Sequence, residues 1–389
     1  MAPFFRFSRV KYIRKVCQTS ANPIKKIPSA GHFVGDPYSL GDPAKPNLGY
    51  PVDAALKLGL DERNGIRGVR VAVRGVDRNL KTSYAHNVFF GIQRELSRGL
   101  VVEASYLGSA GHRLYNSANI NRFRGDLLDG RFNGLNPSFA SINMIEASSN
   151  SIYHGGAIAL RKAWGARLSV SGAYTFGKVI TDADDLVNPS NYLDIANRRL
   201  DRSLAGFDTP RKLALTSIYQ LSEAKQLPVF ARTLLGGWQL AGFFIAQTGN
   251  PINITNSAAY PNGDYNADGS NTDRPNAPAE GVKRADWNRQ QFLNGIFRVA
   301  DFGRPAPGTN GNLSRNAFRG PGFAQMDVSL SKRFRLTERV SLQLRADAFN
   351  ALNRVNLGNP VTDLNNINFG RATTAATPRS IQTGLKILF

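Results

Sequence analysis

Long apolar runs and cysteine are the two features that this sequence most clearly lacks. No stretch reaches 18 consecutive apolar residues, which excludes a membrane-spanning helix, although a transmembrane β-strand needs only about ten residues with alternating faces. Cys17 is the only cysteine, so neither an intramolecular disulfide nor a cysteine-based zinc site can form. Both soluble and membrane β-proteins therefore remain open.

Acidic residues are scarce relative to basic ones, with 28 Asp and Glu against 49 Lys and Arg and a net charge of +21. A basic chain first suggests nucleic-acid binding, and such a protein would show duplex affinity that falls steeply with salt. After residue 26, however, the cations occur mostly singly, with no basic helix face and no RNA-binding aromatic signature. We expect no nucleic-acid partner, and basic groups that face a wet lumen, loops or anionic lipid headgroups instead.

The amino-terminal segment is a poor secretory signal. It begins with basic character, but Arg9, Lys11, Arg14 and Lys15 interrupt the apolar core that export requires. We interpret the chain as a truncated fragment.

From about Thr82 onward, stretches in which apolar and polar residues alternate with period two are followed repeatedly by turn residues. This pattern is typical of β-hairpins. The clearest example is 167–178, where Leu168, Val170, Tyr174 and Phe176 alternate with small polar residues. We predict about nine strands, at 84–95, 100–109, 151–162, 167–178, 210–221, 235–248, 322–334, 339–352 and 379–389.

The connections favour a membrane barrel over a soluble β-sandwich. The turns after Leu96, Ala163 and Leu336 are short, whereas the links at about 110–150, 179–209, 249–321 and 354–378 are long and polar. Short periplasmic turns opposite long extracellular loops are typical of outer-membrane barrels. The predicted fold class is an all-β, antiparallel transmembrane β-barrel, partial, with long extracellular loops. A soluble β-sandwich that binds carbohydrate or another ligand is the alternative, and it predicts solubility without detergent.

The last strand ends the chain on an aromatic residue. Its alternating face comprises Ile381, Thr383, Leu385, Ile387 and the terminal Phe389. This pattern resembles the recognition signal of outer-membrane barrels, which implies that the barrel-assembly machinery would read these residues.

Several phrases together resemble the C-terminal barrel of TonB-dependent receptors of the Oar-like group. They are HNVFFGIQRELSRGLVVEASYLGSAGHRLY, NSIYHGGAIALRKAW, LLGGWQLAGFFIAQTGNPINIT, NLSRNAFRGPGFAQMDVSLSKRFRL and LQLRADAFNALNRVNLGNP, and they cover roughly 80–389. Complete members of that family have a plugged barrel of about 22 strands. The sequence lacks the plug, the energy-coupling box and the export signal, so we expect no closed, active transporter from this chain alone.

The resemblance implies a non-enzymatic receptor in the cell outer membrane. We expect residues 1–80 to be loop-like or irregular and 81–389 to form the barrel part. The implied partners are outer-membrane lipid, the barrel-assembly machinery, an unknown imported substrate and, in a full-length form only, the TonB complex. Substrate choice would reside in the loops 249–321 and 110–150.

Site chemistry is sparse, and we predict no catalytic residues and no cofactors. The loop DYNADGSNTD places Asp264, Asn266, Asp268 and Ser270 at alternate positions, which resembles the first half of a calcium loop. The closing acid is absent, because the twelfth position is Pro275, and a solvated turn explains the same residues. The four histidines, His32, His86, His112 and His154, show no ligand spacing.

Overall fold

The computed structural model describes most of the chain from residue 70 onward. The described residues are 61–63, 70–183, 192–223, 226, 228–270, 272–282 and 287–389, with the backbone of 32–33. Cys17, the side chain of His32 and the predicted poor export signal lie outside these residues. Because most of the segment 1–80 also lies outside them, the division of the chain at residue 80 stays a prediction.

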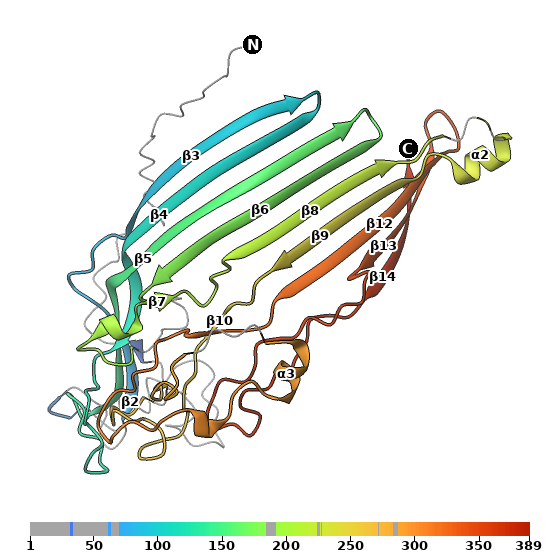
Figure 1. Cartoon of the computed structure of the whole chain (residues 1–389). Helices are drawn as coiled ribbons and strands as arrows, with labels where there is room; N and C mark the ends of the chain where they lie inside the picture. Colours follow the sequence, from blue (N-terminus) through green and yellow to red (C-terminus); the bar gives the residue numbers. More distant parts are fainter. Residues whose placement is uncertain are drawn as a thin grey trace, which may run out of the picture.

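Nine antiparallel strands form one curved sheet, with β3 and β14 at its edges (Figure 1). They are β3 (Tyr84–Ser97), β4 (Leu100–Asn119), β5 (Phe139–Trp164), β6 (Leu168–Thr181), β8 (Arg211–Gln220), β9 (Gln239–Gln247), β12 (Phe323–Arg335), β13 (Ser341–Phe349) and β14 (Ser380–Leu388). Each pairs with the next one in this order. They correspond one to one to the nine predicted strands and confirm the all-β antiparallel class. The sheet is open, not closed into a cylinder.

The predicted loop 110–150 is wrong at both of its ends. β4 continues to Asn119 and β5 begins at Phe139, because the pairing of these two strands extends further toward the loops than the pairing in the other hairpins. Residues 110–119 lack a clean apolar–polar alternation, so period-two analysis ended the strand too early. The sheet also gains β2 (Val71–Val76), parallel to the start of β5, and the short strands β1 (His32–Phe33) and β7 (Ser203–Leu204).

Tight turns join the strands at one end of the sheet. Gly99 has φ +71° and Gly165 has φ +58°, and glycine adopts this left-handed region without the penalty that a Cβ atom brings.

Between β8 and β9 lies the helix α2 (Val229–Leu235), so the predicted strand 235–248 began four residues too early. Among the described residues, no helix has the length and apolar character needed to span a membrane.

The two faces of the sheet differ sharply in chemistry. We call "the wall" the nine strands, with β4 taken up to His112 and β5 from Ser151. One face carries Tyr106, Ile158, Tyr174 and Leu213. Ile158, Tyr174 and Leu213 are cross-strand partners in one register row, and Tyr106 lies in the next row, two residues further along the strands. Within the wall this face holds no Asp, Glu, Asn or Gln. All four wall acids lie on the opposite face, namely Glu95, Glu103, Asp327 and Asp347.

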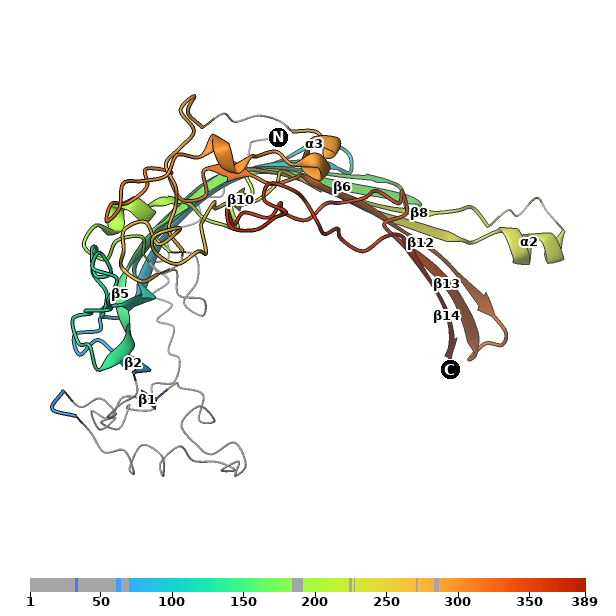
Figure 2. The ribbon, with the colours of Figure 1, turned by 90° about the horizontal axis from the view of Figure 1, so that it is seen from below.

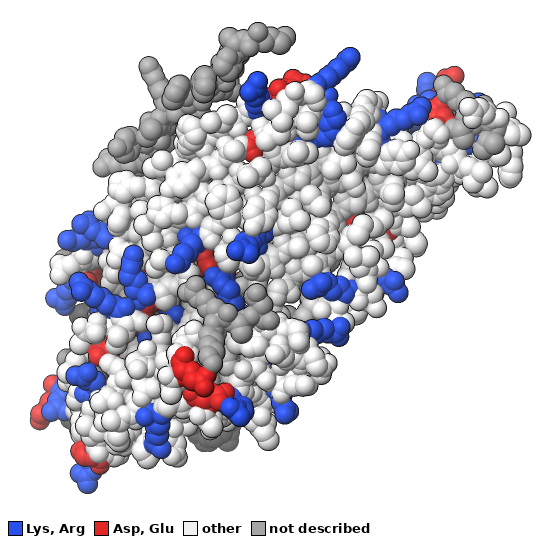
Figure 3. Space-filling model, viewed as in Figure 1, with Lys and Arg blue, Asp and Glu red and all other residues white. Residues whose placement is uncertain are grey.

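The apolar face is the convex one. Figure 2 shows the curvature of the sheet, and Figure 3 looks onto its convex side. A broad band across the strands is almost free of charged side chains there, with Lys and Arg at both of its ends. The cations at the tight-turn end of this face are Arg94, Lys162 and Lys332, and those at the other end are Lys178 and Arg211.

The long connections pack together at the end opposite the tight turns (Figure 1). We call the described residues of 120–138, 192–210, 248–322 and 350–379 "the loop cap". It contains β10 (Pro251–Ile252), β11 (Phe318–Arg319), α3 (Arg289–Asn294) and two short 3-10 turns, η1 (Arg198–Asp201) and η2 (Val299–Asp301).

The loop cap has its own hydrophobic core. The core consists of Ile252, Ile254, Phe297, Phe302, Leu313, Phe318, Leu364 and Phe369. Among the described residues, every buried apolar side chain except Val71 and Ala118 lies in the cap. The long, polar links predicted from sequence are therefore a packed body, because phenylalanines from two of the connections, 248–322 and 350–379, meet there.

Candidate functional site

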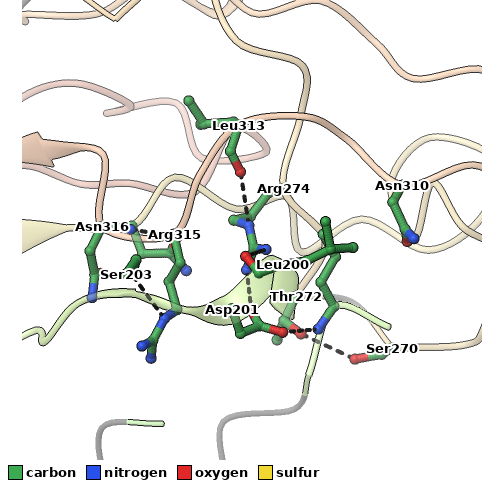
Figure 4. A network of polar contacts seen from close by, with 12 residues as sticks. Leu200, Asp201, Ser203, Ser270, Thr272, Arg274, Asn310, Leu313, Arg315 and Asn316 are labelled. Carbon is green, nitrogen blue, oxygen red and sulfur yellow. Dashed lines mark hydrogen bonds and ion pairs between the residues drawn. The ribbon is translucent and has the colours of Figure 1, made fainter. Parts of the chain in front are cut away.

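Buried polar contacts hold the loop cap together (Figure 4). The guanidinium of Arg274 pairs with the carboxylate of Asp201 at 2.6 Å, and both side chains are 4% exposed. Arg274 also donates to the carbonyl oxygens of Leu313 (3.0 Å) and Leu200 (3.0 Å). One cation thus joins three segments that are distant in sequence.

A second arginine anchors the cap to the wall. Arg315 donates from Nη2 to the carbonyl oxygen of Thr181, the last residue of β6, at 2.7 Å. Its Nε donates to the hydroxyl of Ser203 at 3.2 Å. The loop that precedes β12 is therefore fixed to the end of β6, and the cap is positioned by the wall.

Three carboxylates converge in the interior of the cap. Oxygens of Asp264, Asp268 and Asp273 lie within 4.8 Å of one another. The exposed fractions of these residues are 1%, 8% and 1%. Like charges in such a buried position repel each other strongly unless protons or a cation neutralise them.

The local backbone creates this convergence. Asp264 accepts hydrogen bonds from the backbone N–H groups of Asp268 (3.0 Å) and Gly269 (2.7 Å). Gly269 has φ +76°, which favours glycine at this tight point of the loop. Asp273 accepts from the backbone N–H of Asn266 at 2.9 Å, so the chain folds back and places the third acid beside the first two.

The environment shifts the pKa values of all three carboxyl groups upward. Burial raises the pKa of Asp268 to about 8, and the charges of Asp273 and Asp264 add to the effect. Burial likewise raises the pKa of Asp273 to about 7, with the charge of Asp264 acting in the same direction. Burial also raises the pKa of Asp264, against hydrogen bonds from Gly269 and Asp268 and the nearby Arg122. Near pH 7 the cluster therefore holds protons, or a cation takes their place.

The predicted calcium-loop residues are only partly brought together. Asp264 and Asp268 meet as the alternation indicated, but the third carboxylate is Asp273, which the sequence analysis missed. The amide of Asn266 donates to the carbonyl oxygen of Leu193 at 2.7 Å, and the hydroxyl of Ser270 pairs with that of Thr272 at 3.1 Å. A search for any acid after the glycine, without a fixed twelfth position, would have found Asp273.

A polar cavity of about 250 Å³ lies beside this cluster. It is bordered by Asp268 and Ser270 from the carboxylate loop, by Arg122, and by Asn119 and Asn143 from the paired ends of β4 and β5. The guanidinium of Arg122 donates to the carbonyl oxygen of Asp268 at 3.1 Å. Polar side chains and one cation therefore line most of a small, half-open pocket between the cap and the ends of β4 and β5.

Three of the histidines gather on the convex face near the cap, although their sequence spacing indicated no cluster. The rings of His86 and His112 have centroids 5.8 Å apart, beside Tyr84. The Nδ1 atom of His154 is 2.7 Å from the hydroxyl oxygen of Tyr106. Strand pairing, invisible in linear spacing, creates this arrangement.

The terminal strand places its predicted recognition face on the convex side. Ile387 pairs with Leu342, Leu385 with Leu344, Thr383 with Ala346 and Ile381 with Ala348. Phe389 follows the end of β14 and is 100% exposed. Recognition of this face by an assembly machinery remains a prediction.

Comparison with known proteins supplies a family and several structural neighbours. Residues 30–382 match the family model described as "outer membrane beta barrel domain". None of the curated proteins compared with this chain matches it.

The structural neighbours are outer-membrane transporters, all at low similarity. The outer membrane transporter YddB from Escherichia coli superposes with a TM-score of 0.45 at 13% identity, over 80% of this chain and 33% of its own length. For the FrpB iron transporter from Neisseria meningitidis the TM-score is 0.42 at 10% identity, over 82% and 33%. For the ferripyoverdine receptor of Pseudomonas aeruginosa it is 0.37 at 11% identity, over 79% and 27%. The chain thus spans a third or less of the length of these proteins.

Proposed function

The chain belongs to the outer membrane beta barrel domain family, and from this premise we propose that it forms part of a TonB-dependent receptor that imports a substrate. The family gives an outer-membrane barrel and an outer-membrane location. In the proposed protein this chain supplies wall strands and the extracellular cap. Coupling to the TonB complex belongs to a full-length form, and the chain itself catalyses no reaction.

The separation of charge between the two faces of the wall supports this proposal most directly. The convex face carries no acid and no amide, whereas Glu103 and Asp327 lie on the concave face. Hydrocarbon tolerates the first surface and a water-filled lumen suits the second. A soluble β-sandwich would instead cover its apolar face with a second sheet, and no such sheet lies among the described residues.

The loop cap is the proposed site of substrate recognition. Its phenylalanine core and the buried ion pair Arg274–Asp201 fix its loops to one another, and rigid scaffolds position binding groups well. The segments 249–321 and 110–150, expected from sequence to select the substrate, supply Asp268 and Arg122 to the same cavity. This proximity supports a shared recognition surface.

Uptake measurements test the proposal in cells that carry the intact gene or its deletion. Both strains are grown with and without a protonophore, and compounds lost from the medium are followed by mass spectrometry. We expect at least one compound whose removal requires both the gene and the proton gradient. A solute that enters by passive diffusion serves as the control and should be removed equally by both strains. Equal removal of every compound by the two strains would contradict import by this protein.

We also propose that Asp264, Asp268 and Asp273 bind a divalent cation, with calcium as the preferred ion. Two observations support this: the alternating acids of the sequence and the buried convergence of three carboxylates. Calcium is bound by carboxylate and carbonyl oxygens at about 2.3–2.6 Å, so oxygens already within 4.8 Å of one another can share one ion. The bound ion would replace the protons that the raised pKa values indicate. Equilibrium dialysis with radioactive calcium on the purified full chain tests this site.

A further inference from the structure

A belt of basic residues crosses the convex face where the wall meets the loop cap. His154 on β5 and Lys178 on β6 are direct cross-strand partners, and both are exposed. Arg211 on β8 is paired with Phe176, one row nearer to the middle of the wall. Side chains of directly paired residues lie on the same face at about 5 Å between Cβ atoms. The two cations Lys178 and Arg211 and the histidine His154 therefore form one continuous belt.

An aromatic row lies one row below His154 and Lys178 on the membrane side and is level with Arg211. Phe90, Tyr106 and Phe176 share one register row through β3 to β6. Below it come Ile92, Ile158 and Tyr174 in the next row. The order apolar, aromatic, basic along the strands is the order of hydrocarbon, interface and headgroup in a membrane. The belt is thus placed at the headgroup level of the leaflet on the cap side.

The belt has no acidic partner of its own. Neither Lys178 nor Arg211 makes an ion pair with any described residue, and neither shares its face of the wall with a carboxylate. Positive charge at this level is therefore left for a ligand. The Nδ1 atom of His154 lies 2.7 Å from the hydroxyl oxygen of Tyr106. With the tyrosine as the donor of this bond, Nε2 carries the ring proton and can donate to a ligand.

A pocket of about 460 Å³ opens beside Arg211, between the wall and the cap. Its lining combines Tyr174 and Leu213 from the convex face with Trp287 and Phe292 from the cap. It also includes the cations Arg211, Lys212 and Arg319. Arg319 is held by the carboxylate of Asp208 at 2.5 Å. Of the two other cations of the pocket, Arg211 lies on the convex face and Lys212 follows it on the concave face. Apolar walls beside a free guanidinium suit an amphiphile with an anionic head.

We propose that His154, Lys178 and Arg211, with the adjoining pocket, form a binding site for the phosphate groups of a phosphorylated lipid in the outer leaflet of the outer membrane. Lys and Arg bind phosphate through charge-assisted hydrogen bonds, which are strong where water is partly excluded. The acyl chains would lie on the apolar band, and the aromatic row would flank the sugar or glycerol part. The site depends on the outer-membrane location and not on substrate import.

Lipid retention by the full chain tests the proposal. The protein is extracted from outer membranes in mild detergent, and bound lipid A is counted by native mass spectrometry. The double variant Lys178→Gln/Arg211→Gln is compared with Arg94→Gln/Lys162→Gln, which removes two cations from the tight-turn end of the same face. We expect at least about tenfold less lipid A on the first variant and no change on the second. Heat-modifiable migration in gels verifies that each variant is folded.

Two further arms identify the ligand chemistry. Dephosphorylated lipid A, titrated into delipidated protein, should bind at least about tenfold more weakly than the phosphorylated form. Inorganic phosphate in the millimolar range should not displace the lipid. Equal losses in the two double variants, equal binding of the dephosphorylated lipid, or displacement by inorganic phosphate would each overturn the proposal. If variant folding fails, these two titrations on the unmodified chain still decide the question.

Discussion

Asp264 and Asp273 are nine residues apart, yet their carboxylate oxygens lie within 4.8 Å of each other in the buried interior of the loop cap. Asp268 completes the group, with its carboxylate oxygen within 4.8 Å of the other two. Three ionised carboxylates cannot share this space without compensation. The nearby cations are Arg122 and Arg274, and Arg274 is already paired with Asp201. The occupancy of this cluster by protons or by a cation therefore governs how stable the cap is.

The first prediction concerns calcium affinity. Asp273→Asn removes one of three carboxylates but keeps the side-chain size, so the ion loses both a charged ligand and part of its attraction. We expect calcium affinity to fall by at least about tenfold. Equilibrium dialysis with radioactive calcium on the purified full chain measures this.

Asp129→Asn is the matched control, because Asp129 is an exposed carboxylate of the same cap, bonded to Asn133 and not to the cluster. Its affinity should equal that of the unmodified protein. Absence of calcium binding to the unmodified chain at millimolar concentrations, or equal losses in both variants, would refute the cation site.

The second prediction is a pH dependence of cap stability. The carboxyl pKa values rise from 3.8 to about 8 for Asp268 and to about 7 for Asp273. The folded cap therefore keeps protons that the unfolded chain releases, so the stabilising contribution is complete below pH 3.8 and is lost as pH rises through 8. In cation-free buffer we expect protection of the amides of 264–273 against hydrogen exchange, corrected for intrinsic rates, to fall at least about tenfold between pH 4 and 8.

The same hydrogen-exchange measurement is repeated with saturating calcium. An ion stabilises the ionised carboxylates, so the fall in protection above pH 7 should disappear. Amides at the tight-turn end of β6, opposite the cap, should be unaffected by either pH or calcium. Protection that is constant over this pH range without calcium would show that the raised pKa values are wrong.

The third prediction addresses the buried ion pair. Asp201→Asn leaves Arg274 charged and buried without its carboxylate, and breaking such a pair costs about 3–5 kcal/mol. We expect the local opening free energy of the cap to fall by about that amount, as measured by native-state hydrogen exchange. The exposed pair Arg298–Asp301, with side chains 85% and 31% exposed, gives the comparison. Arg298→Gln should lower this free energy by less than about 1 kcal/mol. Similar decreases in the opening free energy for Asp201→Asn and Arg298→Gln would exclude a special role for Arg274.

Strand positions could be predicted from sequence because each wall strand carries the same binary signal. In β6, Leu168, Tyr174 and Phe176 alternate with Ser169 and Thr175, and the pleat converts that alternation directly into two faces. Where neither face of a strand meets hydrocarbon, the alternation of apolar and polar residues disappears from the sequence. The paired extension of β4 and β5 beyond Gly111 was missed for that reason.

The cap and its carboxylate cluster depend on contacts between distant segments. Phe297, Phe318 and Phe369 come from separate stretches of loop, and no local period marks them as a core. Asp273 was missed because a fixed calcium-loop spacing was applied to a loop that folds back through Asn266. Both are products of tertiary packing, which a single sequence does not encode in a short window.

The fourth prediction tests which face meets lipid. Leu215 and Thr216 are neighbours on β8, and strand pairing places Leu215 on the convex face with Leu213 and Thr216 on the concave face with Phe243. Arginine in hydrocarbon costs about 2–4 kcal/mol near the midplane, whereas a wet lumen accepts it. Leu215→Arg should therefore reduce the folded protein recovered from outer membranes, and Thr216→Arg should not. Recovery that is lower for Thr216→Arg would reverse the assignment of the faces.

The fifth prediction concerns assembly through the last strand. Phe389 is fully exposed beyond β14, so it contributes little packing within the described structure, and Phe389→Ala should leave the folded protein equally resistant to heat. If the terminal face is read by the barrel-assembly machinery, the same change should slow the appearance of folded protein severalfold in a pulse-chase experiment.

Gln382→Ala and Lys386→Ala alter the concave face of the same strand and should assemble at the normal rate. An unchanged rate for Phe389→Ala, or equal slowing in all three variants, would show that the terminal aromatic residue is not the recognised feature. Because stability and rate are measured on the same variants, a kinetic effect of recognition is separated from a loss of packing.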